Sequence, residues 1–229
     1  MQNTIFLMSL VFAHLMGDFV FQTSKLAENK EKSIRGIIQH VIIVLIVNIV
    51  VLSNFGLFGV VAAVLISISH FIIDYLKRVT KGRCRYTTIH NLADQMLHFL
   101  FIFICYFYFK DMARETIINI KYISILNYII LITFVSTVFA KTVLCDISQM
   151  KNLSCDFFLK YERAFDFLII IIVTFAFADI ITGIALLIIA TAIFFVTQNK
   201  FFRYSSKQII IKAAVYLIFA CIFRFLTCQ

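Results

Sequence analysis

The chain has 229 residues, of which 62% are hydrophobic and only 14% are charged. Soluble globular proteins are about half apolar and about a quarter charged, so this composition excludes an ordinary soluble domain. It also excludes an intrinsically disordered chain, which would combine low hydrophobicity with high charge. Uninterrupted apolar runs, such as residues 42–47 and 168–173, argue against a transmembrane β-barrel, whose strands alternate apolar and polar residues. The sequence therefore predicts an all-α fold, a polytopic transmembrane helix bundle.

The expected membrane spans are long apolar runs bounded by polar or charged residues. One span needs about 20 residues, so the chain has room for about seven or eight spans with short loops. We expect spans at residues 3–22, 37–53, 57–76, 92–109, 125–144 and 209–226. The apolar segment 164–196 is too long for one untilted span and short for two, and we divide it into a hairpin at residues 179–183.

No repeat or linker interrupts the sequence, so we expect a single integral membrane domain over residues 1–229. Within it, residues 1–110 form a four-helix core that carries the motifs described below, and residues 111–229 add further transmembrane helices.

The distribution of Lys and Arg predicts the orientation. The net charge is +9, and fifteen basic residues lie in the loops after the first, third, fifth and seventh expected spans. Only three lie in the loops after the second, fourth and sixth. Since basic loops mark the cytoplasmic side of a membrane, we read the charge as a topology signal. We expect the lipid bilayer as a partner and no nucleic acid.

Ionisable side chains within the first four expected spans are the candidate functional residues, because such residues are costly in a membrane. Three His/Asp pairs are each separated by four positions, which places both side chains on one face of a helix. If successive spans run in opposite directions, all these side chains lie at one depth, in the cytoplasmic third of the bilayer. The candidate metal ligands are His14, Asp18, His40, His70, Asp74, Asp94 and His98.

Imidazole and carboxylate groups together are typical of a divalent metal site. The mixed nitrogen and oxygen donors favour Zn, Mn or Fe over Ca or Mg, and we expect Zn or Mn. Seven side chains exceed the usual four ligands of one zinc ion, so they fit two metals, or one metal surrounded by His–carboxylate pairs. A metal with an open position lowers the pKa of bound water to about 7. Asp18 and Asp94 are the candidate catalytic residues, because a carboxylate not used as a ligand can act as general base.

The leading hypothesis is a metal-dependent hydrolase of a lipid-linked or amphiphilic substrate, because the expected site lies at head-group depth. A proton or metal-ion transporter is the first alternative, since chains of carboxylate and histidine also carry protons. The second alternative is a structural or partner-binding membrane protein, in which the same residues form hydrogen bonds between helices. The sequence leaves the oligomeric state open.

Three further expectations concern charged residues near the spans. The polar segment 25–35 forms either an interfacial helix or a solvated loop. Residues 77–91 form the most basic loop, in which His90 is solvated. Lys212 lies within an apolar run, and we expect its ammonium group to extend toward the membrane surface.

Three stretches of the sequence, together with His40, resemble a known family. They read AHLMGDFVFQ at residues 13–22, SHFIIDYLK at residues 69–77 and DQMLHF at residues 94–99. This pattern resembles the bacterial integral membrane family catalogued as domain of unknown function 3307, over about residues 5–110. The resemblance implies a helical protein of the bacterial cytoplasmic membrane with a shared polar site. It implies no particular reaction.

Overall fold

The computed structural model describes residues 2–80, 87–114, 116–148, 194 and 205–227. Within these ranges every regular element is a helix, so the predicted all-α fold is confirmed. The chain divides into two compact units, Met1–Ile130 and Leu131–Gln229. The expected hairpin at residues 179–183 lies outside the described residues, and the total number of spans and the single-domain interpretation stay predictions.

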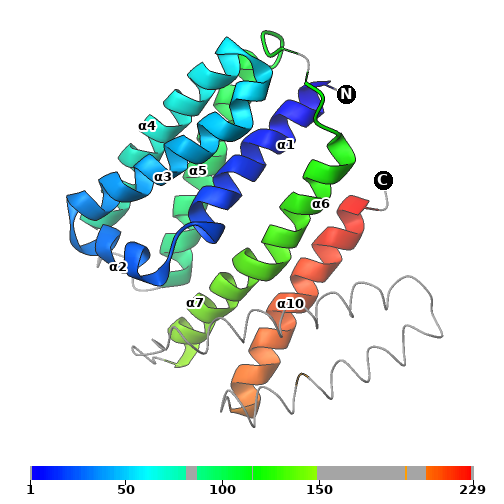
Figure 1. The fold of residues 1–229 in the computed structure, drawn as a ribbon. Coiled ribbons are helices and arrows are strands. Elements are labelled where there is room, and N and C mark those ends of the chain that lie inside the picture. Colours follow the sequence, from blue (N-terminus) through cyan, green and yellow to red (C-terminus); the bar gives the residue numbers. More distant parts are fainter. Residues whose placement is uncertain (1, 81–86, 115, 149–193, 195–204, 228–229) are drawn as a thin grey trace, which may run out of the picture. The chain divides into compact units, whose positions relative to one another are not determined.

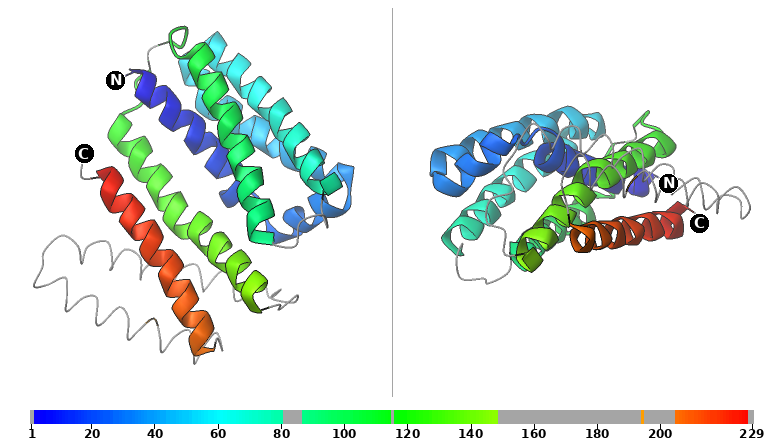
Figure 2. Two further views of the ribbon diagram at one scale, coloured as in Figure 1. Left: turned by 180° about the vertical axis from the view of Figure 1, so that it is seen from behind. Right: turned by 90° about the horizontal axis from the view of Figure 1, so that it is seen from below.

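Four helices in the described part of the chain are long and apolar enough to cross a membrane, which indicates an integral membrane protein. The outer faces of these four helices expose apolar side chains, as expected for a surface in contact with lipid. Examples are Ile42, Ile46 and Val50, which lie on the second of the four. Figure 1 shows these helices side by side, and Figure 2 shows the last of them next to the first and third. They are α1 (Gln2–Leu15) with its π-helical continuation η1 (Met16–Val20), α3 (Ile34–Leu52), α4 (Leu57–Thr80) and α5 (Thr87–Phe109).

A tight turn connects α3 to α4. The 3-10 turn η2 (Ser53–Phe55) follows α3, and Gly56 then adopts a φ of +77°. A side chain is disfavoured in this left-handed conformation, so the glycine allows the chain to reverse within a few residues. The helices α3 and α4 therefore run in opposite directions. This is the arrangement in which their polar residues were predicted to lie at one depth.

The polar segment after the first span is helical. The helix α2 (Ser24–Lys32) begins where the Thr23 hydroxyl accepts a hydrogen bond from the amide of Leu26 at 3.2 Å. The next helix, α3, begins where the Ser33 hydroxyl accepts one from the amide of Gly36 at 3.1 Å. Both are N-terminal caps that satisfy otherwise unpaired amides. This segment is therefore helical over Ser24–Lys32 rather than a loop, and its position at the membrane interface stays a prediction.

The predicted loop at residues 77–91 is wrong at both ends. Helix α4 continues to Thr80, and α5 begins at Thr87. Consequently His90 lies on a helix rather than in a solvated loop, half-buried, with its Nε2 atom 3.2 Å from the Thr80 hydroxyl. The prediction failed because charged residues were taken to end the helix, whereas helices commonly extend beyond the apolar part of a span.

The apolar core of the first unit occupies one end of the four helices. It includes Phe6, Leu52, Phe55, Ala62 and Ile102, all nearly or fully buried, and the rings of Phe6 and Phe55 meet edge to face with centroids 5.0 Å apart. These residues come from the beginning of α1, the end of α3 and η2, the beginning of α4 and the later part of α5. The opposite ends of the same helices are therefore left for polar residues.

The sixth helix completes the first unit. Helix α6 (Ile120–Ile130) packs along α1 (Figure 1), and the Asn127 side chain donates a hydrogen bond to the backbone oxygen of Met8 at 2.9 Å. A polar contact of this kind fixes the position of one helix against another where both are otherwise apolar.

The second unit is described through η3 (Leu131–Val135), α7 (Ser136–Ser148), Phe194 and α10 (Ser206–Thr227). Helices α7 and α10 pack against each other. The expectation for Lys212 is wrong, because its side chain is buried, with the ammonium group 5.6 Å from the ring centre of Tyr216 and 6.0 Å from that of Phe194. Aromatic rings attract a cation, which favours a buried position over extension to the surface.

Gly36 is expected to be essential for the packing of α2 against α3. A Cβ atom at Gly36 would lie 2.4 Å from the backbone carbon and oxygen of Asn29, so Gly36→Ala should destabilise the protein by about 1–3 kcal/mol, as overpacking does. The control is Gly17→Ala, whose Cβ would meet the movable Cγ2 atom of Val44 at 3.0 Å. Thermal unfolding in detergent should show the larger loss for Gly36→Ala, and equal losses would contradict the assignment.

Candidate metal centre

All seven predicted residues lie in one buried cluster, at the end of the four helices opposite the apolar core. Each side chain is at most 5% exposed, and contacts between neighbouring members connect the whole set. The residues are His14 on α1, Asp18 on η1, His40 on α3, His70 and Asp74 on α4, and Asp94 and His98 on α5. The predicted convergence of these side chains is therefore present, whereas their roles stay predictions.

Asp18, His40 and His70 bring three ligand atoms into mutual contact. The Oδ1 atom of Asp18 lies 3.0 Å from His70 Nε2 and 3.3 Å from His40 Nε2, and the two nitrogens are 3.0 Å apart. Ligands about 2.0–2.1 Å from a tetrahedral zinc ion are about 3.3–3.4 Å from one another. The spacing of these three atoms is close to that of ligands around one metal ion.

Asp74 adds a fourth donor to this group. Its Oδ2 atom lies 3.7 Å from His40 Nε2 and 3.6 Å from His70 Nε2. We call these four residues the four-donor group. Their number matches the ligand number of a zinc site, and the ligand atoms of Asp18, His40 and His70 lie within 4.8 Å of one another, so these buried groups could hold a metal ion.

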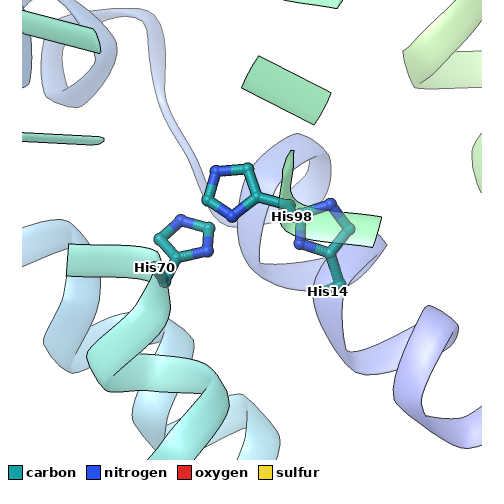
Figure 3. Close-up of side chains that lie close together, drawn as sticks. All are labelled: His14, His70 and His98. Atoms are coloured by element: carbon teal, nitrogen blue, oxygen red, sulfur yellow. The ribbon is translucent and has the colours of Figure 1, made fainter. Parts of the chain in front are cut away.

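The other members of the cluster lie beside this four-donor group. The rings of His70 and His98 stack with their centroids 4.1 Å apart, and the ring of His14 lies 5.2 Å from that of His98. Figure 3 shows these three rings gathered from α4, α5 and α1. Ligand atoms of Asp74, Asp94 and His98 also lie within 4.8 Å of one another, so the cluster contains more than one possible set of ligands.

Gln95 connects three members of the cluster. Its Nε2 atom donates to Asp18 Oδ2 at 3.4 Å and to Asp94 Oδ2 at 3.3 Å. Its Oε1 atom lies 3.2 Å from His14 Nε2. Because the amide nitrogen faces carboxylates, the amide oxygen is the acceptor, and His14 therefore donates from Nε2. Ligand atoms of His14, His70 and His98 also lie within 4.8 Å of one another, so the predicted metal role of His14 stays a prediction.

Two lysines that the sequence analysis did not single out are ion-paired with the cluster. The ammonium group of Lys30, on α2, lies 3.0 Å from both carboxylate oxygens of Asp74. The ammonium group of Lys77, on the last turns of α4, lies 2.7 Å from Asp94 Oδ2. Spacing contained a signal for Lys77, which follows Asp74 by three positions and so shares its helical face. Nothing in the spacing indicated Lys30.

The ion pair of Lys30 persists over a wide pH range. Burial alone would lower the pKa of Lys30, but the surrounding carboxylates, Asp74 foremost, outweigh burial and raise this pKa above its ordinary value. Since the pKa is higher in the folded than in the unfolded protein, the pair contributes its full stability below the unfolded pKa. That contribution is lost only as the pH rises through the folded pKa, in the alkaline range.

A local irregularity positions Asp18. The π-helical turn η1 follows α1 and contains Asp18, and Gly17 lets this turn approach Val44 of α3 closely. Such π-helical turns are rare and occur frequently at functional sites. The turn brings the Asp18 carboxylate against His40, which lies on the neighbouring helix.

Comparison with known families agrees with this geometry. Residues 6–126, more than half of the chain, match the family described as Protein of unknown function (DUF3307). The chain belongs to this family. The resemblance predicted from the motifs is thereby confirmed, and the DUF3307 region contains all seven clustered residues together with Lys30, Lys77 and Gln95. No curated protein and no solved structure matches the chain.

Loss of the Lys30 ammonium should leave Asp74 as an uncompensated buried charge. We expect Lys30→Met to lower the free energy of unfolding by about 3–5 kcal/mol, measured by thermal unfolding in detergent with a chelator present. Lys25→Met, an exposed change on the same helix, is the control and should stay within about 0.5 kcal/mol of wild type. Adding Asp74→Leu to Lys30→Met should recover stability. Equal behaviour of the two lysine variants would refute the pairing.

Proposed function

We propose that this protein is a divalent-metal-dependent hydrolase of the bacterial cytoplasmic membrane, acting on a lipid-linked or amphiphilic substrate. The observation that carries the proposal is the four-donor group formed by Asp18, His40, His70 and Asp74. Zn or Mn is the proposed metal, because both accept imidazole and carboxylate ligands.

The charges of the cluster support a bound cation. Three buried carboxylates, those of Asp18, Asp74 and Asp94, are matched by the two ammonium groups of Lys30 and Lys77. The carboxylates of the cluster thus outnumber these ammonium groups by one in a region of low polarity. Buried charges are normally paired or coordinated to metals, so this excess supports a bound cation.

The proposed chemistry uses water bound to the metal. A metal held by these residues would supply hydroxide at neutral pH, because its bound water has a pKa near 7; attack of that hydroxide on an ester or a phosphate ester would break the ester C–O or P–O bond and release an alcohol. Of the two carboxylates predicted to be catalytic, Asp18 is a metal ligand in this proposal. Asp94 lies outside the four-donor group, and its catalytic role stays a prediction.

The position of the cluster supports an amphiphilic substrate. The seven residues lie toward the same end of the four antiparallel helices, so in this proposal the site is closer to one membrane surface, within reach of a lipid head group. Within the described part of the chain, the carboxylates and imidazoles of the spans gather at this end rather than line a path across the bundle. This distribution favours hydrolysis over the transport alternative.

The proposed orientation places this end of the bundle in the cytoplasm. Exposed basic side chains surround it, including Lys25, Lys32 and Arg35. An excess of basic residues in short connections marks the cytoplasmic side of a membrane protein.

Metal binding is the first test of the proposed function. Protein purified in detergent should contain bound Zn or Mn by element analysis, and His70→Ala and Asp18→Asn should each remove it, because each deletes one donor. His90→Ala is the matched control, since His90 pairs with Thr80 rather than with the cluster, and it should keep the metal. Wild-type protein that folds but takes up no metal would count against the proposal.

Hydrolysis is the second test. We expect the metal-loaded protein to cleave at least one of two amphiphilic probes, p-nitrophenyl dodecanoate or dodecyl phosphate, in detergent micelles. A chelator and His70→Ala should each reduce the rate at least about 100-fold, as loss of a catalytic metal does, and His90→Ala should leave it unchanged. If loaded protein cleaves neither probe, or if His70→Ala cleaves as fast as wild type, hydrolysis of this class is excluded.

A further inference from the structure

Several buried polar atoms of the cluster have no hydrogen bond among the described residues, and two of them belong to α5 and lie next to the four-donor group. These two are Asp94 Oδ1 and His98 Nε2, on side chains 5% and 3% exposed. The two atoms face each other at 3.6 Å. The two atoms meet only in this long ion-pair contact, and a buried polar atom without a good hydrogen bond costs free energy, so a cation shared between them would satisfy both.

The distance between these atoms fits a metal ion. At 3.6 Å it is too long for a hydrogen bond between the two side chains. It is close to the separation of about 3.3–3.4 Å between two ligands of one tetrahedral ion. Asp74 supplies a third donor, because its ligand atom lies within 4.8 Å of those of Asp94 and His98.

We infer that Asp74, Asp94 and His98 bind a second divalent cation, so that the cluster is a two-metal centre with Asp74 shared between the ions. The inference rests on the proposed function for the first ion. It is supported by the stacking of His70 and His98, which belong to different ions and whose ring centroids are 4.1 Å apart. Ions in two-metal hydrolytic sites are about 3.5–4 Å apart, a separation that stacked ligand rings of this spacing allow.

Lys77 leaves one oxygen atom of Asp94 available, whereas Lys30 shares Asp74 with any ion bound there. Lys77 and Gln95 both contact Asp94 through Oδ2, which holds the carboxylate with Oδ1 turned toward His98. Lys30 contacts both oxygens of Asp74, and it is the cation with which the metals must share that carboxylate. In this centre Asp94 is a ligand rather than the acceptor of a proton from water, and two ions rather than one polarise the reacting group.

The number of ions bound per chain and their magnetic coupling test the inference. Full-length, detergent-purified protein is stripped with a chelator and titrated with Mn²⁺, and bound manganese is measured by equilibrium dialysis and electron paramagnetic resonance. We expect about two ions per chain, with the broadened spectrum of coupled ions at a separation of about 3.5–4 Å. His98→Gln should lower the number to about one and restore the spectrum of an isolated ion, whereas His90→Gln should keep two.

Each outcome decides between defined alternatives. One ion per wild-type chain with an uncoupled spectrum would overturn the second site and leave the proposed function intact. No bound ion would overturn both. Two coupled ions in His98→Gln would show that the second ion lies elsewhere. Because the coupling is measured on the wild-type protein, the inference remains testable even where a variant does not fold.

Discussion

Three aspartate side chains lie among apolar helices, where a charge without a partner costs several kcal/mol. Each comes from a different element, Asp18 from η1, Asp74 from α4 and Asp94 from α5, and each is met by imidazole, amide or ammonium groups from neighbouring helices. The requirement to compensate these charges therefore decides how the helices approach one another at this end of the bundle. The polar cluster is both the candidate site and the reason for the local packing.

The same constraint separates the bundle into two regions. Rings and aliphatic side chains such as Phe6 and Phe55 fill the end where no charge has to be compensated. Between the regions, Asn48 donates to Ser67 at 3.1 Å, and the Ser67 hydroxyl donates to the backbone oxygen of Ala63. These bonds pair the Asn48 amide nitrogen and the Ser67 hydroxyl inside the bundle, while the outward faces stay apolar.

The cluster could be predicted from the sequence because it depends on local properties. A spacing of four residues defines a helical face, and the alternation of span direction defines depth, so the pairing of His70 with Asp74 on one face needed no tertiary information. Lys77 was missed because the helix was taken to end at its first charged residue. Lys30 was missed because its position depends on the close contact of Gly36 with the backbone of α2, which no spacing encodes.

Lys30 has a consequence for how the site responds to its ligand. This lysine comes from α2, the short amphipathic segment between two spans, and it holds Asp74 through both oxygens. Any cation that takes a share of Asp74 weakens the attachment of α2. In the proposed metal centre, any displacement of α2 from Asp74 would strengthen cation uptake by the same factor, because coupling of two equilibria is reciprocal. Occupancy of that centre and docking of this segment would then be thermodynamically linked.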